Sequence, residues 1–383
     1  KTHKGEKISY HSLPCLIREK SLLFMSIQGG GMEIFMKHVL LPEENGEIKY
    51  YKVNLHCHST FSDGKKTPEE LKEFYKKHGY GAVAFTDHDI FITHNDLTDD
   101  EFVALNGFEF EISEEGKDWR DAKTCHICYV ALSDENSKSI CYHRTKYITP
   151  KNQKWRPLVN FDENEPDYER EYTKECINDM IKKGKENGFF VTYNHPTWSG
   201  ERYPEYMSYE GMDAMEISNY SSVADGYDEY NGRCYDDMLC GGKKIYCVSA
   251  DDNHNLQPDG GVKCDSFGGY ICAFVKKLDY KSLTDALLNG HFYSVTGTCT
   301  HEGPKIKSLL FEDGKLYVKT SEAAKICFIC NSKRCLSSLA EDGKSVTEAV
   351  FNVYENEEYF RIEVYDEKGY RAYSNAYFLS DLK

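Results

Sequence analysis

The sequence predicts an α/β region followed by a small antiparallel β domain, and three observations support this fold class. The chain has 383 residues, of which 40% are hydrophobic and 29% are charged, so it is long enough for two or three globular domains. From residue 50 onwards, short apolar runs alternate with amphipathic stretches, which is the pattern of strands alternating with helices. Near residue 300 this alternation gives way to short strands separated by turn signals.

The first strand and the first helix are clearly marked. Residues 50–56 have the apolar character of a strand. Thr67 then has the features of a helix N-cap, because Pro68 occupies the first helical position and two glutamates follow in the first turn. Apolar residues continue at helical spacing up to Gly79, which ends the predicted helix.

The rest of the α/β region is predicted from similar signals. Further strands are expected at residues 82–86, 102–112, 126–132, 189–194, 212–217, 244–249 and 270–275. Helices are expected at residues 168–187, 227–239 and 280–288. Strands that alternate with helices in this way favour a parallel barrel or sheet.

The C-terminal part is predicted as a separate β domain. Strands are expected at residues 308–320, 324–331, 347–353 and 358–365, with Gly-containing turn signals between them. This spacing predicts a small antiparallel β-sandwich of about 80 residues. We therefore expect an N-terminal extension at 1–45, an α/β domain at 46–298 and a β-sandwich at 299–383. In the extension, Met25 and Met32 are both candidate native starts, so the sequence before Met32 could be foreign or upstream sequence.

The charge and the cysteines restrict the partners and the compartment. With 47 Lys+Arg and 63 Asp+Glu, the net charge of −16 argues against binding to long nucleic acid or to an anionic membrane surface. No apolar run approaches the ~20 residues that span a bilayer. The 15 cysteines are odd in number and scattered, which predicts reduced thiols and a cytoplasmic protein. The oligomeric state is not readable from the sequence.

Histidines and carboxylates gather where the predicted strands end. His56 and His58 end the first strand at an i, i+2 spacing, so both side chains face one side. Asp252 and His254 repeat this spacing after the strand at 244–249. The other groups at or near strand ends are Asp63, His88, Glu109, His126 and His195. Catalytic groups collect at such ends, and imidazole and carboxylate bind Zn²⁺, Mn²⁺ or Fe²⁺, so a metal centre is predicted.

Each motif has a simpler explanation when it stands alone. A single His-x-His is more often a structural pair than a metal site, and the Asp and His of Thr86-Asp87-His88-Asp89 also favour turns. The metal interpretation depends on the conjunction of all these segments in one order along the chain.

That order resembles the PHP (polymerase and histidinol phosphatase) superfamily over about residues 50–295. The family pattern is HxHxxxSDG, TDHD, GxE, two separate histidines and DxH. The matching segments are HCHSTFSDG at 56–64, TDHD at 86–89, GFE at 107–109, His126, NHP at 194–196 and DNH at 252–254. The tail resembles the small β domain that some bacterial members append.

The resemblance implies a distorted (β/α)7 PHP barrel with two to three divalent metal ions. The implied ligands are His56, His58 and Asp252 for the first ion, Glu109 as the bridge, His126 and His195 for the second ion, and Asp63, His88 and His254 for the third. Glu111 shares a strand face with Glu109 and is an alternative bridge; the spacing from Gly107 favours Glu109. Some members have His at the position of Asp63, and a carboxylate there makes Mn²⁺, Fe²⁺ or Mg²⁺ credible beside Zn²⁺.

The metal centre favours a phosphoesterase. The sequence has no GxSxG or Walker-type motif for serine or P-loop chemistry. We therefore expect a metal-bound hydroxide, held by Glu109, His56, His58 and Asp252, to attack a phosphate ester of a small molecule. A nucleotide or nucleoside bisphosphate is one candidate substrate. Asp87 and Asp89 flank His88 and are expected either to fix its imidazole or to serve only as turn residues.

Three further residues are candidates for contact with the substrate. Arg202 and Lys263 follow predicted ligands in loops and could clamp the phosphate, although a surface charge is the simpler explanation for each. Trp198 could stack on a base or simply cap the barrel. Two other functions stay open: amidohydrolase-like cleavage of a C–N or C–O bond at the same metals, and a non-catalytic binding protein stabilised by metal.

Overall fold

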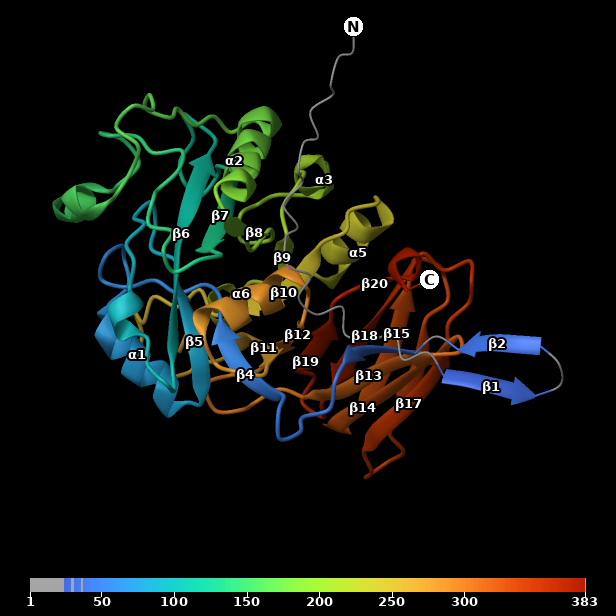
Figure 1. The fold of residues 1–383 in the computed structure, drawn as a ribbon. Helices are drawn as coiled ribbons and strands as arrows, with labels where there is room; N and C mark the ends of the chain where they lie inside the picture. Colours follow the sequence, from blue (N-terminus) through green and yellow to red (C-terminus); the bar gives the residue numbers. More distant parts are fainter. Residues whose placement is uncertain (1–23, 29–30, 36, 383) are drawn as a thin grey trace, which may run out of the picture.

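The computed structural model describes residues 24–28, 31–35 and 37–382 and shows a mixed α/β fold (Figure 1). Three sheets are present in this part of the chain. A hairpin of β1 (Phe24–Gln28) and β2 (Gly31–Phe35) forms the smallest sheet. The sequence before Phe24, with the start of the predicted extension, lies outside the described residues.

Seven strands of the largest sheet lie side by side in chain order. They are β4 (Lys49–Asn54), β5 (Tyr80–Phe85), β6 (Val103–Ser113), β7 (Thr124–Ala131), β8 (Phe189–Tyr193), β9 (Ala214–Asn219) and β10 (Tyr246–Ala250). The predicted parallel arrangement holds for β4–β5–β6 and for β8–β9–β10. It is wrong for β7, which is antiparallel to both neighbours, because a loop rather than a crossover helix joins β6 to β7.

The two ends of this seven-stranded series meet beyond β4 and β10. Cys57 and Asn253 form a parallel bridge, and the backbone NH of Asp252 donates to the carbonyl of His56 at 2.9 Å. This contact is a bridge between strand extensions, so the sheet itself is not closed. It brings the His56–His58 segment next to the Asp252–His254 segment.

Within the described residues, four α-helices follow the predicted order, two of them with later starts, and two short α-helices were not predicted. The α-helices are α1 (Pro68–Lys77), α2 (Lys174–Glu186), α3 (Tyr203–Ser208), α4 (Tyr220–Asp225), α5 (Gly232–Cys240) and α6 (Tyr280–Leu288). The 3₁₀ helices are η1 (Asn95–Leu97), η2 (Pro150–Leu158) and η3 (Leu379–Asp381). At α1 the predicted cap is confirmed, since Thr67 and Glu70 form a capping box. The predicted start of α2 at residue 168 is wrong. The helix begins at Lys174, because Thr173 caps it by accepting from the NH of Cys176.

The C-terminal strands continue the large sheet and add a second one. The large sheet gains β11 (Gly269–Val275), β12 (Phe292–Thr296), β15 (Lys325–Cys330), β16 (Leu336–Leu339), β18 (Tyr359–Tyr365), β19 (Arg371–Ser374) and β20 (Tyr377–Phe378). The four-stranded sheet consists of β3 (Lys37–Leu41), β13 (Ile306–Glu312), β14 (Lys315–Ala323) and β17 (Val346–Asn352). In Figure 1 the orange and red strands β13–β18 lie to one side of the α/β part.

One apolar core connects the two regions. Phe85 of β5, Tyr270 of β11 and Phe328 of β15 belong to the same cluster of buried side chains. Leu41 of β3, from the predicted N-terminal extension, is also in this cluster. The division into three domains therefore stays a prediction, and the large sheet runs without a break from β10 to β16.

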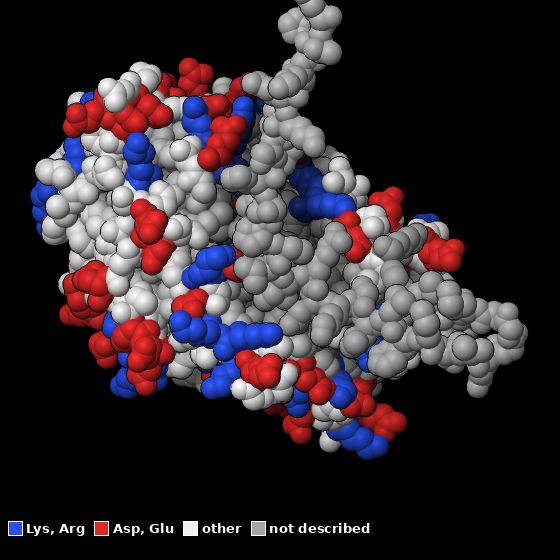
Figure 2. All heavy atoms as spheres, viewed as in Figure 1, with Lys and Arg blue, Asp and Glu red and all other residues white. Residues whose placement is uncertain are grey.

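The surface carries both signs of charge. On the face seen in Figure 2, Lys and Arg side chains are interspersed with Asp and Glu. Within the described ranges, no helix is long and apolar enough to cross a membrane.

Candidate metal centre

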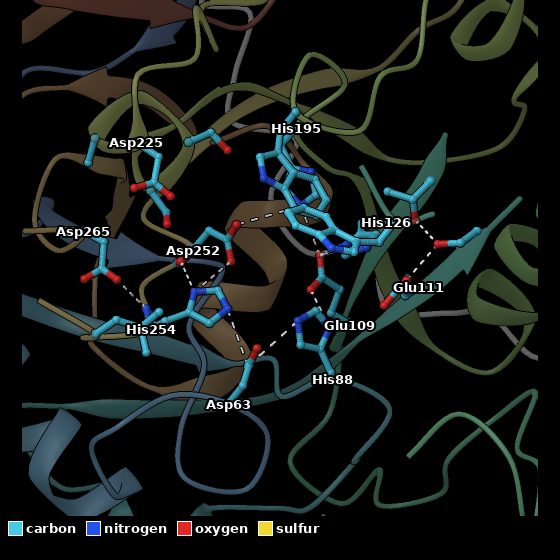
Figure 3. A pocket seen from close by; sticks show the side chains of 18 of the residues that line it. Asp63, His88, Glu109, Glu111, His126, His195, Asp225, Asp252, His254 and Asp265 are labelled. Carbon is cyan, nitrogen blue, oxygen red and sulfur yellow. Dashed lines mark hydrogen bonds and ion pairs between the residues drawn. The ribbon is translucent and has the colours of Figure 1, made fainter. Parts of the chain in front are cut away.

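A cavity of about 570 Å³ opens where the strands of the α/β part end. Its wall contains seven of the predicted ligands: Asp63, His88, Glu109, His126, His195, Asp252 and His254 (Figure 3). His56 and His58 are not in the wall; both are buried, and both contact the carboxylates of Glu109 and Asp252. The structure thus brings all nine predicted ligands together at one place.

The Glu109 carboxylate occupies the centre of this cluster. It is 1% exposed, and its oxygens lie 3.1 Å from Nδ1 of His126 and 3.1 Å from Nδ1 of His88. Nitrogens of three further imidazoles lie within 3.5 Å of it: those of His56, His58 and His195. Glu111 instead accepts from the hydroxyl of Ser113 at 2.7 Å on the cavity wall. The geometry therefore favours Glu109 over Glu111 as the bridging residue.

The candidate ligand atoms fall into four overlapping groups, in each of which all atoms lie within 4.8 Å of one another. The groups are His58/Asp63/His88/His254, His56/His58/Glu109, His56/His195/Asp252 and His88/Glu109/His126. This division differs from the one implied by the family resemblance at three residues. His58 groups with Asp63, His88 and His254 as well as with His56, and His88 groups with Glu109 and His126 as well as with Asp63 and His254. His195 groups with His56 and Asp252 rather than with His126.

Three residues of the centre have strained backbones. Asp89, His195 and Asp252 have φ values of 58°, 23° and 54°, in the left-handed region that non-glycine residues rarely adopt. Such strain persists only where surrounding contacts hold it, and it is typical of functional sites. In this protein it turns the chain sharply next to three of the predicted ligands, His88, His195 and Asp252.

The protonation behaviour of the cluster fits a site for divalent cations. Burial opposes charge on His195, but a hydrogen bond to Glu109 and the charge of Asp252 raise its pKa to about 9. Burial and the neighbouring charges of His254 and His88 lower the pKa of His58 to about 4. Despite burial, the histidines hold the pKa of the Glu109 carboxyl well below its usual value. The carboxylates are thus ionised and attract positive charge, which protons or metal ions can supply.

An unpartnered nitrogen adds to this fit. Nε2 of His126 is buried and has no hydrogen-bond partner among the residues that the structure describes. A buried polar atom without a partner is costly, and a metal ion would satisfy it. The residues present therefore fit divalent metal ions.

Asp87 and Asp89 bond partners other than His88. The Asp87 carboxylate accepts from the NH and hydroxyl groups of both Ser59 and Ser62, at 2.6–2.9 Å. It thereby fixes the loop between His58 and Asp63. Asp89 pairs with Nη2 of Arg170 at 2.6 Å. Within the described residues, neither carboxylate bonds the His88 imidazole: Asp87 anchors the loop after His58, and Asp89 pairs with the Arg170 side chain.

The candidate substrate residues have different positions. The Trp198 ring lies on the cavity wall, with its centroid 5.3 Å from that of His126 and 5.0 Å from that of His195. Lys263 lines the mouth, 3.8 Å from Asp225. The structure does not bring Arg202 to the wall, because its guanidinium donates to the carbonyl of Glu201 at 2.9 Å and its backbone precedes α3.

Three residues hold the ligands in place in a role that the sequence did not predict, although Asn219 was expected to line the pocket and Asn194 belongs to the NHP motif. Asn194 donates to Glu109 at 2.7 Å, and Asn219 donates to Asp252 at 3.1 Å. Glu216 contacts Nδ1 of His56 at 2.8 Å. The signal for Glu216 was the single charged residue in a strand, since β9 reads AMEISN and is buried along its whole length.

Residues 54–182 match the family model described as the PHP domain. The matched segment contains the predicted ligands from His56 to His126 and ends before His195, Asp252 and His254. No curated protein matches the chain.

Three solved structures match the chain at low sequence identity and with TM-scores below 0.5. A two-domain protein from Bacteroides vulgatus, containing a predicted PHP-like metal-dependent phosphoesterase, matches at 16% identity and TM-score 0.44 over 88% of this chain and 98% of that chain. A metal-dependent phosphoesterase from Bifidobacterium adolescentis, also assigned by prediction, matches at 16% identity and TM-score 0.36 over 55% and 90% of the respective chains. An amidohydrolase from Chromobacterium violaceum, with bound sulfate and no metal, matches at 16% identity and TM-score 0.34. The match covers 53% of this chain and 87% of that chain. Similarity at this level says nothing about the substrate.

Proposed function

We propose that the chain is a metal-dependent phosphoesterase, on the premise that residues 54–182 match the family model of the PHP domain. Its substrate would be a phosphate ester of a small molecule, such as a nucleotide or a nucleoside bisphosphate. Two to three divalent ions, Zn²⁺, Mn²⁺, Fe²⁺ or Mg²⁺, would be held by His56, His58, Asp63, His88, Glu109, His126, His195, Asp252 and His254.

The observation that carries this proposal is the open cluster of candidate metal ligands around Glu109. A structural metal site is normally closed by its protein ligands, whereas a catalytic site keeps a position free. In this protein, seven of the nine candidate ligands line a cavity, so water and substrate could reach the ions. Divalent ions lower the pKa of water and neutralise charge that develops on phosphoryl oxygens, which is the chemistry that ester hydrolysis needs.

The surrounding residues support a small substrate. A volume of about 570 Å³ is within the usual range for small-molecule sites. Trp198 would contact the organic part of the ester, and Lys263 would attract the phosphate towards the mouth. Glu111, Glu114 and Asp225 also line the cavity, so its metal-free form is acidic and should bind phosphate poorly. Bound ions would reverse the local charge, while the overall charge of −16 still disfavours long nucleic acid.

We propose the finer architecture and the location on the same premise. The strands β4–β10, with the bridge between Cys57 and Asn253, would correspond to the distorted (β/α)7 barrel at 46–298. The strands from β13 onwards would form the β-sandwich at 299–383. The protein would act in the cytoplasm, where its cysteines would stay reduced.

Phosphate release from a panel of phosphate esters tests the function. The expected result is release by the Mn²⁺-loaded protein and none by chelator-treated protein. Release that does not depend on metal would refute the mechanism. No release from any ester, with metal bound, would favour cleavage of a C–N or C–O bond or a binding role.

A further inference from the structure

Glu216 is a buried carboxylate that contacts three parts of the metal centre at once. It is 1% exposed and lies on β9 beneath the cavity. One oxygen lies 2.8 Å from Nδ1 of His56. The other accepts from the backbone NH of His195 at 2.9 Å and from the amide of Asn219 at 3.0 Å.

These contacts converge on one of the four ligand groups, His56/His195/Asp252. Glu216 bonds the ring of His56 and the backbone of His195 directly. It reaches Asp252 through Asn219, whose side-chain nitrogen also donates to Oδ2 of Asp252 at 3.1 Å. None of the other three groups consists of residues that Glu216 holds in this way.

The contact with His56 determines which ring nitrogen can bind a cation. Carboxylate oxygens accept hydrogen bonds, so the 2.8 Å contact places the His56 proton on Nδ1. Nε2 then keeps its lone pair. Nε2 is also the atom that faces the cluster, 3.2 Å from Oδ1 of Asp252 and 3.2 Å from Oε1 of Glu109.

We propose that Glu216 is the positioning residue for the metal ion held by His56, His195 and Asp252. It fixes the His56 tautomer, the strained backbone of His195 and, through Asn219, the Asp252 carboxylate. This inference rests on the proposed metal centre but not on the identity of the substrate or of the bond cleaved.

A glutamine at this position cannot replace the carboxylate. If its NH₂ group faced His56, Nδ1 would have to accept, and the proton would move to Nε2, which blocks ligation. If the NH₂ group faced the other side, it would oppose the NH of His195 and the amide of Asn219, and buried donors would lose their acceptor. Either orientation disturbs the same ligand group.

Glu229 provides a matched control. It is also fully buried, and it accepts from the backbone NH groups of Thr197 at 3.0 Å and Trp198 at 2.7 Å. Its side chain also accepts from the amide of Asn231 at 2.6 Å. Glu229 therefore fixes the same turn after His195 and has no bond to a ligand side chain. Loss of either carboxylate should cost similar stability, and only Glu216 should affect the metal.

The test measures Mn²⁺ bound per chain against free Mn²⁺ for wild type, E216Q and E229Q, without substrate. We expect one of the wild-type Mn²⁺ sites to bind about 10- to 100-fold more weakly in E216Q and unchanged binding in E229Q. Nitrogen-15 NMR of protein loaded with diamagnetic Zn²⁺ should show the proton of His56 on Nδ1 in wild type and in E229Q, and this signature should be altered in E216Q. Unchanged Mn²⁺ binding in E216Q, or equal losses in both variants, would overturn the proposal.

Two results keep the outcomes separate. If E216Q does not fold, Glu216→Asp is the second variant, because it keeps a carboxylate and only shortens the side chain. We expect this variant to bind Mn²⁺ at the same site somewhat more weakly than wild type. Mn²⁺ binding equal to that of wild type would contradict the positioning role of Glu216. Wild-type protein that binds Mn²⁺ but releases no phosphate would refute the proposed function and leave this inference standing. Wild-type protein that binds no Mn²⁺ would overturn both.

Discussion

The floor and the mouth of the cavity are built differently. The floor consists of His56, His58, Glu109 and Asp252, and each of these residues is at most 8% exposed. At the mouth, Trp119 is 76% and Leu256 is 58% exposed. The floor side chains contact one another, and His56 also contacts the buried carboxylate of Glu216. The two lysines of the mouth, Lys117 and Lys263, lie beside Glu114 and Asp225 in exposed ion pairs.

This difference separates two tasks. Buried, mutually bonded groups hold a fixed geometry, which a metal centre requires. Exposed side chains in weak ion pairs are free to rearrange around a substrate, so they can set preference but contribute little fixed geometry. We therefore expect substitutions on the floor to remove metal and activity, and those at the mouth to change substrate affinity only.

The largest effect is expected at the floor itself. Asp252→Ala or His58→Ala should reduce phosphate release by more than about 100-fold, because each removes a ligand shared by the cluster. The fold should be preserved, as judged by circular dichroism, and bound Mn²⁺ should decrease in parallel. Full activity in either variant would contradict the assignment of the floor.

The second-largest effect is expected at Asp87, which holds the loop after His58 in place. Asp87→Ala removes the acceptor of four hydrogen bonds from Ser59 and Ser62, so we expect a loss of about 3 kcal/mol in the free energy of unfolding. Urea unfolding of the metal-free protein measures this loss. A change below about 1 kcal/mol would show that the loop after His58 does not depend on Asp87.

The loop that joins floor and mouth should respond to pH through Glu201. Burial raises the pKa of Glu201 to about 7, although the hydroxyls of Tyr193, Tyr209 and Tyr172 counteract this. The folded state binds the Glu201 proton more tightly than the unfolded state does. The stability that this proton contributes is therefore fully present below the ordinary pKa of 4.5 and is lost as the pH rises through 7. The stability advantage of wild type over E201Q should therefore fall by roughly 3 kcal/mol from about pH 5 to about pH 8. If thermal unfolding gave wild type and E201Q the same dependence of stability on pH, the role of Glu201 would be contradicted.

A smaller effect is expected at Trp198, on the wall between floor and mouth. Trp198→Ala should raise KM for an ester with a ring by about tenfold, the usual contribution of stacking, and leave kcat nearly unchanged. Esters without a ring serve as the control and should keep their KM. If Trp198→Ala lowered kcat and left KM unchanged, Trp198 would act on the metal centre and not on substrate binding.

The smallest effect is expected at the mouth. Lys263→Ala should raise KM by about threefold or less, because an exposed charge already paired with Asp225 contributes little. Asp225→Asn should have the opposite sign, since it releases Lys263 and removes a negative charge. An increase in KM above about 30-fold in Lys263→Ala would identify this residue as a main phosphate clamp and break the distinction between floor and mouth.

The floor was the more predictable region from the sequence. Ligands at strand ends appear as short motifs, and the i, i+2 spacing at His56 and His58 already places two rings on one side. The cap at Thr67 was equally readable, because it depends on residues within one helical turn.

Other features depend on contacts between distant segments. The antiparallel course of β7 follows from the loop connection, which hydrophobic patterning does not encode. Arg202 and Lys263 are both cations in loops, and only their tertiary contacts separate one from the other. Glu216 was missed because its role depends on His56, which lies 160 residues away in sequence.

Locating metal ions in crystals of the Mn²⁺-loaded protein by anomalous scattering, together with metal content per chain, tests the central claim most directly. We predict two to three ions around Glu109, one of them bound by His56, His195 and Asp252. No ion in this cavity, or ions bound only outside the nine ligands, would contradict the account.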